Sequence, residues 1–398
     1  MKRYVIIGNG AAGASAAEQI RLLDNEGSIT MFTRESHPFY YRPRLPEYLA
    51  GEISLDKFTM HSPDKYKQWR VDLRLEDSIV SIDPKAGRVV SAKSGPLDYD
   101  ALLLACGASA NIPSLPGTDK KGVFALRSLE DANAIKAAAA RSGQAVLVGG
   151  GLMGLEAGHA LIKLGLRVQV AEFFGRLLPR QMDAAGAGLL QALLEKMGFV
   201  FHLNVRVREI SGADCAQGLL LENGTCLPGG LVIFSAGIRP NLELAIDLQT
   251  DKAIKVNEYM RTSQPGVWAA GDAAEYQGQP GGIWPTAMAQ GKAAGADMAG
   301  KPFPYLPKPP SASLKVAGIN LTSAGDIDPE DKLTAKRLIR GDNYRKIILR
   351  DDVIKGFIFL GAAEGVRQCA EAMNQGKKLG SLTDELDRED FDFKRLSL

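Results

Sequence analysis

Cysteine is scarce in this chain of 398 residues, which has four, at Cys106, Cys215, Cys226 and Cys369. No two of them form a C-x-x-C or C-x4-C pattern, so the sequence indicates neither a redox-active dithiol nor a metal site. Cys215 and Cys226 flank a hairpin-like stretch, and we expect both to remain reduced thiols.

Histidine is equally rare, and His37, His61, His159 and His202 are isolated from one another in the sequence. A nucleophile–histidine–aspartate relay therefore has no anchor, and no G-x-S-x-G nucleophile elbow is present. His159 falls on a predicted helix, where we expect its side chain to pack or to be solvated.

Long apolar runs and an excess of one charge are also missing. The longest apolar runs break at glycine, well short of the ~18 residues that span a bilayer. The N-terminal MKRYVIIGNG enters a predicted strand at once and leaves no room for a signal peptide, so we expect a cytoplasmic protein with no membrane partner. The 48 Lys and Arg residues nearly cancel the 46 Asp and Glu residues, and their scatter argues against a nucleic-acid partner.

A glycine turn near the N-terminus is the first positive signal. Residues 3–7, RYVII, are a β-branched apolar run, G-N-G-A-A-G follows, and residues 14–23 have a helical pattern. In this order the first glycine allows a tight turn, the second lets the backbone approach a phosphate, and the third packs helix on strand. The helix N-terminus then faces a dinucleotide pyrophosphate. The residues of this turn are Gly8, Gly10, Ala11, Ala12 and Gly13.

An acid follows the second strand predicted for this unit, at residues 28–32. Glu35 is our candidate for the ribose hydroxyls, although the usual position of the acid corresponds more closely to Thr33.

The same pattern returns in the middle of the chain. Strand residues 145–148 lead into G-G-G-L-M-G, a helical pattern over 155–165, and a strand over 167–172 that ends at Glu172, 23 residues after Gly149. That spacing is close to the ~20 residues expected for an acid that binds ribose. The residues of this second turn are Gly149, Gly151, Leu152, Met153 and Gly154. Two complete units predict two nucleotide sites in one chain.

The acid of the second unit also indicates which nucleotide binds there. A carboxylate accepts hydrogen bonds from both ribose hydroxyls and repels a 2′-phosphate, so Glu172 favours NADH over NADPH. Arg176 or Arg180 could soften that preference. Phe173 and Phe174, which follow the acid, either belong to this site or are packing residues.

The remaining sequence suggests three domains of an α/β protein. Other apolar strands end at Ala105-Cys106-Gly107, at Gly237 and at Gly271-Asp272, as expected where backbone presses against flat cofactors. A proline-rich stretch over 301–310 predicts a stiff linker. Beyond it, alternation predicts antiparallel strands within 313–327, 345–352 and 353–362, followed by a helix within 362–379. We expect residues 383–398 to form a solvated helix or a frayed tail.

These motifs together resemble the FAD-dependent pyridine nucleotide–disulphide oxidoreductase superfamily over essentially the whole chain. The resemblance is carried by VIIGNGAAG, LLLACGA, VLVGGGLMGLE, FSAGIRPN and VWAAGDAAE. PFYYRPRL, IWPTAMAQG and SLKVAGINLTSAGD are most similar to NADH:rubredoxin oxidoreductases and to the flavin part of assimilatory NADH nitrite reductases.

The resemblance implies two Rossmann-like domains of the glutathione-reductase type plus a small C-terminal α+β domain. FAD would bind a discontinuous domain of residues 1–108 and 242–308, and NADH an inserted domain of residues 109–241, with residues 309–398 as the third domain. It further implies, residue by residue, that Glu35 binds the FAD ribose, that Val80 contacts adenine through its backbone, and that Asp272 binds the ribityl chain. Glu156 would lie near the nicotinamide, with Gly237 on the NADH side. Further contacts to FAD are implied for Arg42, Pro43, Cys106, Gly107, Arg127, Gly271, Trp284 and Pro285.

Two positions depart from the family pattern. Cys106 stands where threonine is usual, and we interpret it as a small buried replacement rather than a redox centre. Glu47 stands where related reductases often carry a lysine that faces the flavin. It is either a carboxylate near the flavin or an exposed helix residue.

Related enzymes pass electrons to a cysteine, but the segment PFYYRPRLPEY, residues 38–48, contains none. The flavin is therefore the last redox centre that we expect, with electrons leaving to a small carrier protein such as rubredoxin. Tyr40, Tyr41 and Arg44 could line that path or be ordinary core and surface residues. The alternatives are an NADH oxidase or small-molecule reductase, and a flavin-bearing interaction protein. We expect a monomer or a homodimer.

Overall fold

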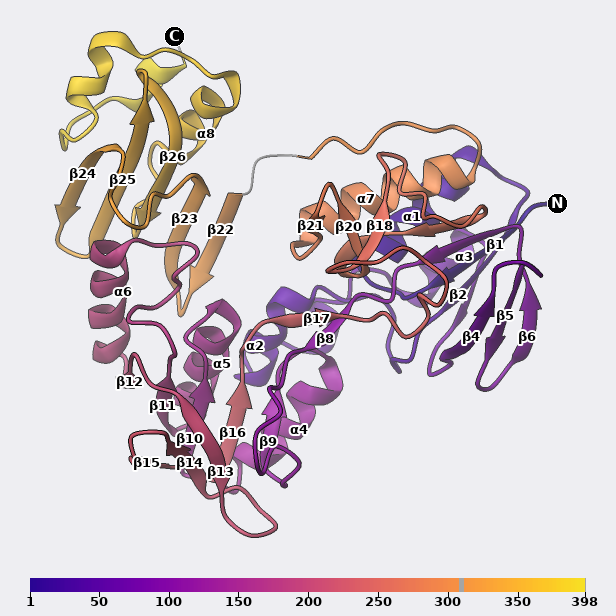
Figure 1. Ribbon diagram of the computed structural model, residues 1–398, viewed down its shortest axis with the longest axis horizontal. Coiled ribbons are helices and arrows are strands. Elements are labelled where there is room, and N and C mark those ends of the chain that lie inside the picture. The colour runs from indigo at the N-terminus through magenta and orange to yellow at the C-terminus, as the bar shows by residue number, and fades with distance from the viewer. Residues whose placement is uncertain (308–310, 398) are drawn as a thin grey trace. The chain divides into compact units, whose positions relative to one another are not determined.

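The computed structural model describes residues 1–307 and 311–397, which form two compact units (Figure 1). Unit 1 comprises Met1–Arg44, Ile53–Ser109 and Ile238–Pro307, and unit 2 comprises Leu45–Glu52, Ala110–Gly237 and Lys308–Leu398. Residues 301–307 of the predicted linker form neither helix nor strand, and residues 308–310 lie outside the described residues. Among the described residues, no helix is long and apolar enough to cross a membrane.

A parallel sheet forms the centre of unit 1, with the strand order β19-β7-β1-β2-β3. Side chains alternate across it: Tyr4 and Ile6 of the central strand face helices α1 and α7, whereas Val5 and Ile7 belong to the core on the other face. An antiparallel sheet, β4-β5-β6, contributes Ile79 to that second core. The strands are β1 (Arg3–Ile7), β2 (Ser28–Phe32), β3 (Val71–Arg74), β4 (Ile79–Asp83), β5 (Arg88–Ser91), β6 (Gly95–Asp98), β7 (Ala101–Leu104) and β19 (Val267–Ala269).

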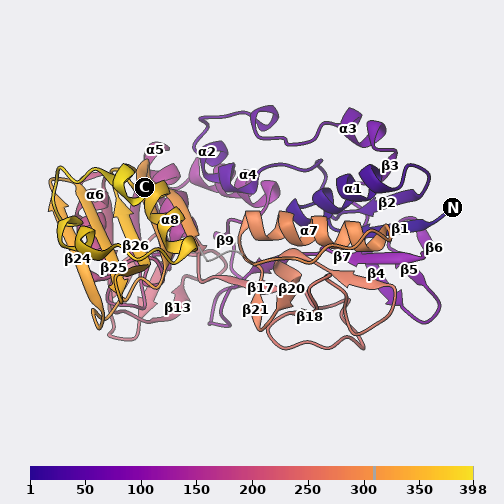
Figure 2. The same ribbon diagram turned by 90° about the horizontal axis from the view of Figure 1, so that it is seen from above.

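Helices α1 (Ala11–Leu23) and α7 (Trp284–Met298) lie side by side in both views (Figure 2). The close approach depends on glycines in α7, because a Cβ on Gly291 or Gly295 would collide with the backbone of Ala12 or Ala16 in α1. These small residues therefore let α1 and α7 pack with their backbones close together. The smaller elements of unit 1 are η1 (Arg42–Arg44), η2 (Leu55–Lys57), α3 (Pro63–Gln68), β18 (Ile254–Val256), η3 (Gly271–Ala273), β20 (Ala274–Tyr276) and β21 (Gln279–Pro280).

Unit 2 contains a second parallel sheet, with the order β12-β11-β10-β16-β9. Val146 and Val232 of this sheet pack on the antiparallel sheet β13-β14-β15. Its strands are β9 (Val123–Ala125), β10 (Gln144–Val148), β11 (Arg167–Ala171), β12 (Phe199–His202), β13 (Val207–Ser211), β14 (Gly218–Leu221), β15 (Cys226–Pro228) and β16 (Leu231–Phe234). Its helices are α2 (Leu45–Leu49), α4 (Leu129–Ala139), α5 (Leu152–Lys163) and α6 (Ala184–Lys196). A separate two-stranded sheet pairs β8 (Ala108–Ala110) with β17 (Ile238–Pro240).

The C-terminal part of unit 2 is an antiparallel sheet with the order β22-β23-β26-β25-β24. The structure confirms the predicted strands and the predicted helix, and it adds β24, which the sequence did not suggest. The elements are β22 (Ser311–Val316), β23 (Ile319–Gly325), β24 (Thr334–Arg340), β25 (Asn343–Arg350), β26 (Val353–Leu360), α8 (Val366–Gln375), η4 (Gly380–Glu385) and η5 (Phe393–Leu396).

The prediction of a solvated or frayed C-terminus is wrong. Phe391, Phe393 and Leu396 are 5%, 4% and 1% exposed, and they pack with Phe357 and Phe359 in the core beneath this sheet. Asp392 and Lys394 between them are exposed, so apolar side chains interrupted by charged residues are brought together in the core.

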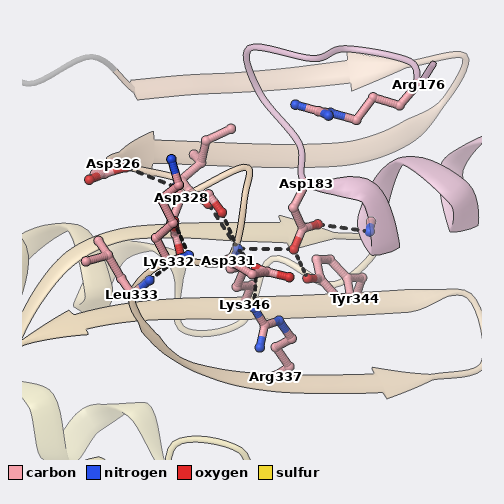
Figure 3. A network of polar contacts seen from close by, with 12 residues as sticks. Arg176, Asp183, Asp326, Asp328, Asp331, Lys332, Leu333, Arg337, Tyr344 and Lys346 are labelled. Atoms are coloured by element: carbon pink, nitrogen blue, oxygen red, sulfur yellow. Dashed lines mark hydrogen bonds and ion pairs between the residues drawn. The ribbon is translucent and has the colours of Figure 1, made fainter. Parts of the chain in front are cut away.

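A buried lysine connects this C-terminal sheet to helix α6 (Figure 3). Lys346, on β25, is fully buried and donates to the carbonyls of Ile327 (3.2 Å) and Asp328 (2.7 Å) and to Asp331 Oδ1 (2.6 Å). Its Nζ also lies 3.3 Å from Asp183 Oδ2. Asp183 in turn accepts from Tyr344 Oη (2.6 Å) and caps α6 through the N–H of Gly186. The network therefore satisfies a charge that would be costly to bury alone.

Candidate dinucleotide sites

The first glycine turn has the geometry of a phosphate cradle. Gly8 has φ +113°, and a Cβ there would collide with the carbonyl of Ala105, so the tight turn requires glycine. A Cβ on Gly13 would collide with the carbonyl of Gly8, which is the close packing of helix on strand expected from the sequence. A Cβ on Gly10 would meet nothing within 4 Å, so open space lies where a pyrophosphate would approach.

Helix α1 leaves its N-terminus available to an anion. Gly10 is the N-cap, no side chain caps the helix, and the first turn carries no acidic residue. The first N–H groups of a helix without such partners, together with the helix dipole, favour a phosphate. The turn and the helix therefore fit the FAD pyrophosphate.

The predicted ribose acid of this unit, Glu35, is held in a polar cluster. Glu35 accepts from Tyr40 Oη (2.6 Å) and is paired with Arg42. Burial works against the charged form of Arg42, but Tyr40, Glu35 and Asp272 outweigh it and raise the pKa of the guanidinium. The structure thus brings three predicted site residues together, Glu35, Arg42 and Asp272. Their contacts with FAD remain a prediction.

Two buried amides, which sequence reasoning missed, shape the strand ends around these residues. Gln290 is 1% exposed, and its Oε1 accepts from the N–H of Gly271, which fixes the backbone beside Asp272. Asn241 accepts a hydrogen bond from Ser109 and donates from Nδ2 to the carbonyl of Cys106 (2.8 Å). Both amides stand inside motifs that the sequence offered, FSAGIRPN and IWPTAMAQG.

Cys106 is half-buried, so it is less enclosed than the interpretation of a small buried replacement expects. Its Sγ lies 3.4 Å from the carbonyl of Asn241, and burial raises the pKa of the thiol to about 11. The neighbouring Gly107 has φ +68°, and a Cβ there would meet nothing within 4 Å. This strand end is therefore open beside a protonated thiol.

Aromatic side chains surround the start of α7. Trp284, the first residue of the helix, stacks on Phe39 with ring centroids 5.3 Å apart, and Tyr41 meets it edge-on at 4.8 Å. Tyr41 therefore belongs to an aromatic cluster rather than to a plain surface, and no side chain caps α7 here. Arg44 is half-buried and donates to the carbonyl of Lys57.

Three further positions were singled out from the sequence. Val80 is 60% exposed and sits at a β-bulge in the pairing of β4 with β5, which takes its backbone out of the regular ladder. Pro43 is exposed, within η1. Arg127 lies in unit 2, where its N–H donates to Asp131 ahead of α4, and its contact with FAD remains a prediction.

The second glycine turn repeats the first in unit 2. Gly149 has φ +107°, and a Cβ there would lie 2.5 Å from the carbonyl of Ser235. Gly154 packs equally closely, on the carbonyl of Gly149. Helix α5 starts after Gly151 with no side-chain cap and no acid in its first turn, so it too fits a pyrophosphate.

Glu172 lies against this turn, as the spacing predicts. It is 5% exposed, and its carboxylate accepts from the N–H groups of Gly150 and Phe174 (2.7 Å to the latter). These bonds fix the carboxylate and leave it lone pairs for ribose hydroxyls.

The residues that follow Glu172 are on the surface. Phe173 and Phe174 are 50% and 52% exposed, so they are not packing residues of a core, and Arg206 lies 4.8 Å over the ring of Phe173. Arg180 is exposed and Arg176 half-buried. Gly237 is exposed, and a Cβ there would meet nothing within 4 Å.

The two predicted catalytic carboxylates, Glu47 and Glu156, both lie in unit 2. Burial raises the pKa of Glu156, and the charge of Glu47 on α2 adds to the increase. Glu47 is half-buried, so it is not the exposed helix residue of the simpler alternative. His159, one turn after Glu156, is also half-buried. Within the described ranges, no group of three or more His, Cys, Asp or Glu side chains could hold a metal ion.

Comparison with known proteins agrees with this geometry. The family model described as pyridine nucleotide-disulphide oxidoreductase matches residues 2–291. The chain belongs to this family. Residues 310–377 match a second model, the rubredoxin NAD+ reductase C-terminal domain. FAD and NAD(H) are the cofactors of the family, and that the two glycine turns hold their pyrophosphates remains a prediction.

Individual relatives cover most of the chain. An assimilatory nitrate reductase electron transfer subunit of Bacillus subtilis is 36% identical over 366 residues, which are 90% of this chain and 48% of that protein. The chain thus spans about half the length of that relative. An NADH-rubredoxin oxidoreductase of Clostridium acetobutylicum is 30% identical over 96% of this chain and 97% of its own. Putidaredoxin reductase, in its covalent complex with putidaredoxin, superposes with a TM-score of 0.89 at 25% identity, covering 100% of this chain and 98% of that one.

Proposed function

We propose that the protein is an FAD-dependent NADH:acceptor oxidoreductase that passes electrons to a small iron or iron–sulphur protein of the rubredoxin kind. The observation that carries the proposal is the pair of glycine turns before uncapped helix N-termini in a chain whose cysteines are all free thiols. All four cysteines lie in the described residues. Cys106, at a strand end beside the first turn, has a thiol that is protonated at neutral pH and is therefore a poor nucleophile.

The residues of unit 1 would bind and orient the flavin cofactor. The N-terminus of α1 would hold the pyrophosphate, Glu35 the adenosine ribose and Asp272 the ribityl chain. FAD, when bound, supplies the redox chemistry, since it accepts a hydride from NADH and can release electrons singly.

The residues of unit 2 would bind and orient NADH. The N-terminus of α5 would hold its pyrophosphate and Glu172 its adenosine ribose. No side chain has to move a proton at the reacting carbon, so the contribution of the protein is alignment and electrostatic stabilisation.

The C-terminal sheet supports the choice of acceptor. Its residues match a domain named after rubredoxin NAD+ reductases, and a relative with that activity in its name spans nearly the whole chain. A relative named as an electron transfer subunit is consistent with a chain that delivers electrons to another protein.

Anaerobic stopped-flow absorbance tests this proposal. The FAD-loaded protein is mixed with NADH and, once its flavin absorption has bleached, with either oxidised rubredoxin or air-saturated buffer. We expect rubredoxin to restore the flavin absorption orders of magnitude faster than oxygen does. If oxygen restores the flavin absorption faster, the protein is an NADH oxidase and not a carrier reductase. If NADH does not bleach the flavin at all, the proposal of an NADH oxidoreductase is wrong.

A further inference from the structure

Glu156 receives a hydrogen bond from a distant part of unit 2. Its Oε1 accepts from the backbone N–H of Ala317 at 2.7 Å, and the two residues are 161 positions apart in the chain. Ala317 lies in the turn between β22 and β23, and β22 packs on α5, the helix that carries Glu156. The C-terminal sheet thus contributes directly to the surroundings of this carboxylate.

The turn that carries Ala317 has an unusual backbone. Ala317 and Gly318 have φ +50° and +88°, the pattern of a two-residue turn in which both central residues are left-handed. Alanine is disfavoured in that conformation, and it is only 3% exposed here. Left-handed residues other than glycine persist where the surroundings enforce them, often at functional sites.

The C-terminal sheet, which includes the β22–β23 hairpin, is also anchored away from the Ala317 turn. The buried Lys346 and Tyr344 on β25 both bind Asp183, the N-cap residue of α6 (Figure 3). The C-terminal sheet is therefore attached to α6 as well as to α5. With attachment at α6 and at α5, the Ala317 N–H has a defined position relative to Glu156.

The surroundings of Glu156 show how the Ala317 N–H affects the pKa of this carboxylate. Burial disfavours the carboxylate, and Glu47 on α2 disfavours it further, whereas Lys163 on α5 and Lys315 on β22 favour it. After burial, the Ala317 N–H has the largest influence on the pKa of Glu156, and it favours the charged form. The hairpin therefore opposes the protonation that burial would otherwise promote.

We propose that the Ala317 N–H is a positioning group of the NADH site, which keeps Glu156 ionised and oriented toward the nicotinamide. This inference rests on the proposed function. Glu156 lies about 6 Å along α5 from the first helical residue, within reach of the nicotinamide half of a nucleotide whose pyrophosphate occupies the helix N-terminus. On transfer of the C4 hydride of NADH to the flavin, the electron pair of the C4–H bond would go with the hydride and the nicotinamide ring would become a cation. An ionised Glu156 stabilises that charge, and no proton moves at the carboxylate.

An amide-to-ester replacement tests the proposal with the full-length, FAD-loaded protein. Nonsense suppression with lactic acid at position 317 replaces N–H by oxygen and keeps the methyl group. The same replacement at Ala362, an exposed loop residue of the C-terminal sheet, is the matched control. The carboxyl 13C resonance of labelled Glu156, assigned by its loss in Glu156→Gln, reports its pKa without any turnover.

We expect the ester at 317 to raise the pKa of Glu156 by roughly one pH unit and the ester at 362 to leave it unchanged. The rate at which NADH bleaches the flavin should decrease as the pH drops through the pKa of Glu156. In the ester protein, the midpoint of this decrease should lie at a higher pH, by the same amount as the pKa. Glu156→Gln should remove the pH dependence. An unchanged pKa and pH profile in the 317 ester, with normal bleaching of the wild type, would overturn the inference alone. Absence of bleaching in the wild type would instead overturn the proposed function.

A second measurement does not depend on the ester protein folding. Hydrogen exchange of the Ala317 amide, followed by 15N NMR, should accelerate at least tenfold in Glu156→Ala, because the acceptor is gone. Equal exchange in the wild type and the variant would show that the hydrogen bond does not form, and would overturn the inference.

Discussion

Replacing Lys346 by methionine should destabilise unit 2 strongly. Methionine has nearly the same length and volume, so the cavity term is small. The loss is electrostatic: the ammonium makes three hydrogen bonds and lies 3.3 Å from Asp183, which is 1% exposed. Removing one partner of a buried ion pair costs about 3–5 kcal/mol, because the other charge stays buried without compensation. In a unit of this size that corresponds to a decrease in Tm of about 10 °C.

Urea unfolding followed by far-UV circular dichroism measures this loss. Tryptophan fluorescence provides an internal reference, since Trp69, Trp268 and Trp284 all lie in unit 1 and report its unfolding. We expect the dichroism transition of Lys346→Met to move to lower urea, and the fluorescence transition to move much less.

Two further variants test the physical reason. Lys332→Met removes an exposed lysine from the neighbouring loop, where it pairs with Glu330 on the surface, and should leave both transitions in place. Asp183→Asn retains the ability to cap α6, so adding it to Lys346→Met should recover part of the loss by removing the uncompensated charge. If Lys346→Met were as stable as Lys332→Met, the electrostatic account of the network would be wrong.

Three other predictions concern the sites and the pH dependence. Glu172→Ala should raise the apparent KM for NADH at least tenfold while the flavin absorption spectrum stays the same, and unchanged steady-state kinetics would remove Glu172 from the NADH site. Iodoacetamide at pH 7.5 should label the exposed Cys215 and Cys226 but not Cys106 or Cys369, whose pKa values burial raises to about 11 and about 12, and mass spectrometry of the peptides would reveal any labelling that contradicts this. Because the hydrogen bond from Lys346 lowers the pKa of Asp331, this pair stabilises the folded state above the ordinary aspartate pKa near 3.9, and its contribution is lost as the pH falls further. The urea midpoint should therefore fall more steeply below about pH 4 in the wild type than in Lys346→Met, and parallel curves would contradict the assignment.

The local parts of both sites could be predicted from the sequence. A strand, a glycine turn and a helix are contiguous in the chain, and Gly8, Gly13, Gly149 and Gly154 are required because a Cβ there would collide with backbone. This is why Gly8, Gly13, Gly149 and Glu172 stand where their spacing indicated.

The non-local parts could not be predicted in the same way. No periodic pattern reveals that Ala317 donates to Glu156 or that Lys346 binds Asp183, because these contacts arise only when separate elements pack. The prediction of a solvated or frayed C-terminus was wrong for a related reason. Phe393 and Leu396 stand among charged residues, so no sustained helical or strand period is visible, and the apolar surface that they cover is formed by the sheet and helix α8 together.

The path of the chain between the two units has a consequence for synthesis. The chain changes unit five times, and the parallel sheet of unit 2 is complete once β16 ends at Phe234. The sheet of unit 1 begins with β1 at Arg3 but lacks β19 until residue 269 and α7 until residue 298. On a ribosome, where domains fold as units when their residues emerge, we expect the later sheet to fold first. Strands β1 and β2 and helix α1 must then wait, with the apolar face of α1 uncovered, for helix α7 to pack on it, so we expect unit 1 to reach its final structure after the parallel sheet of unit 2.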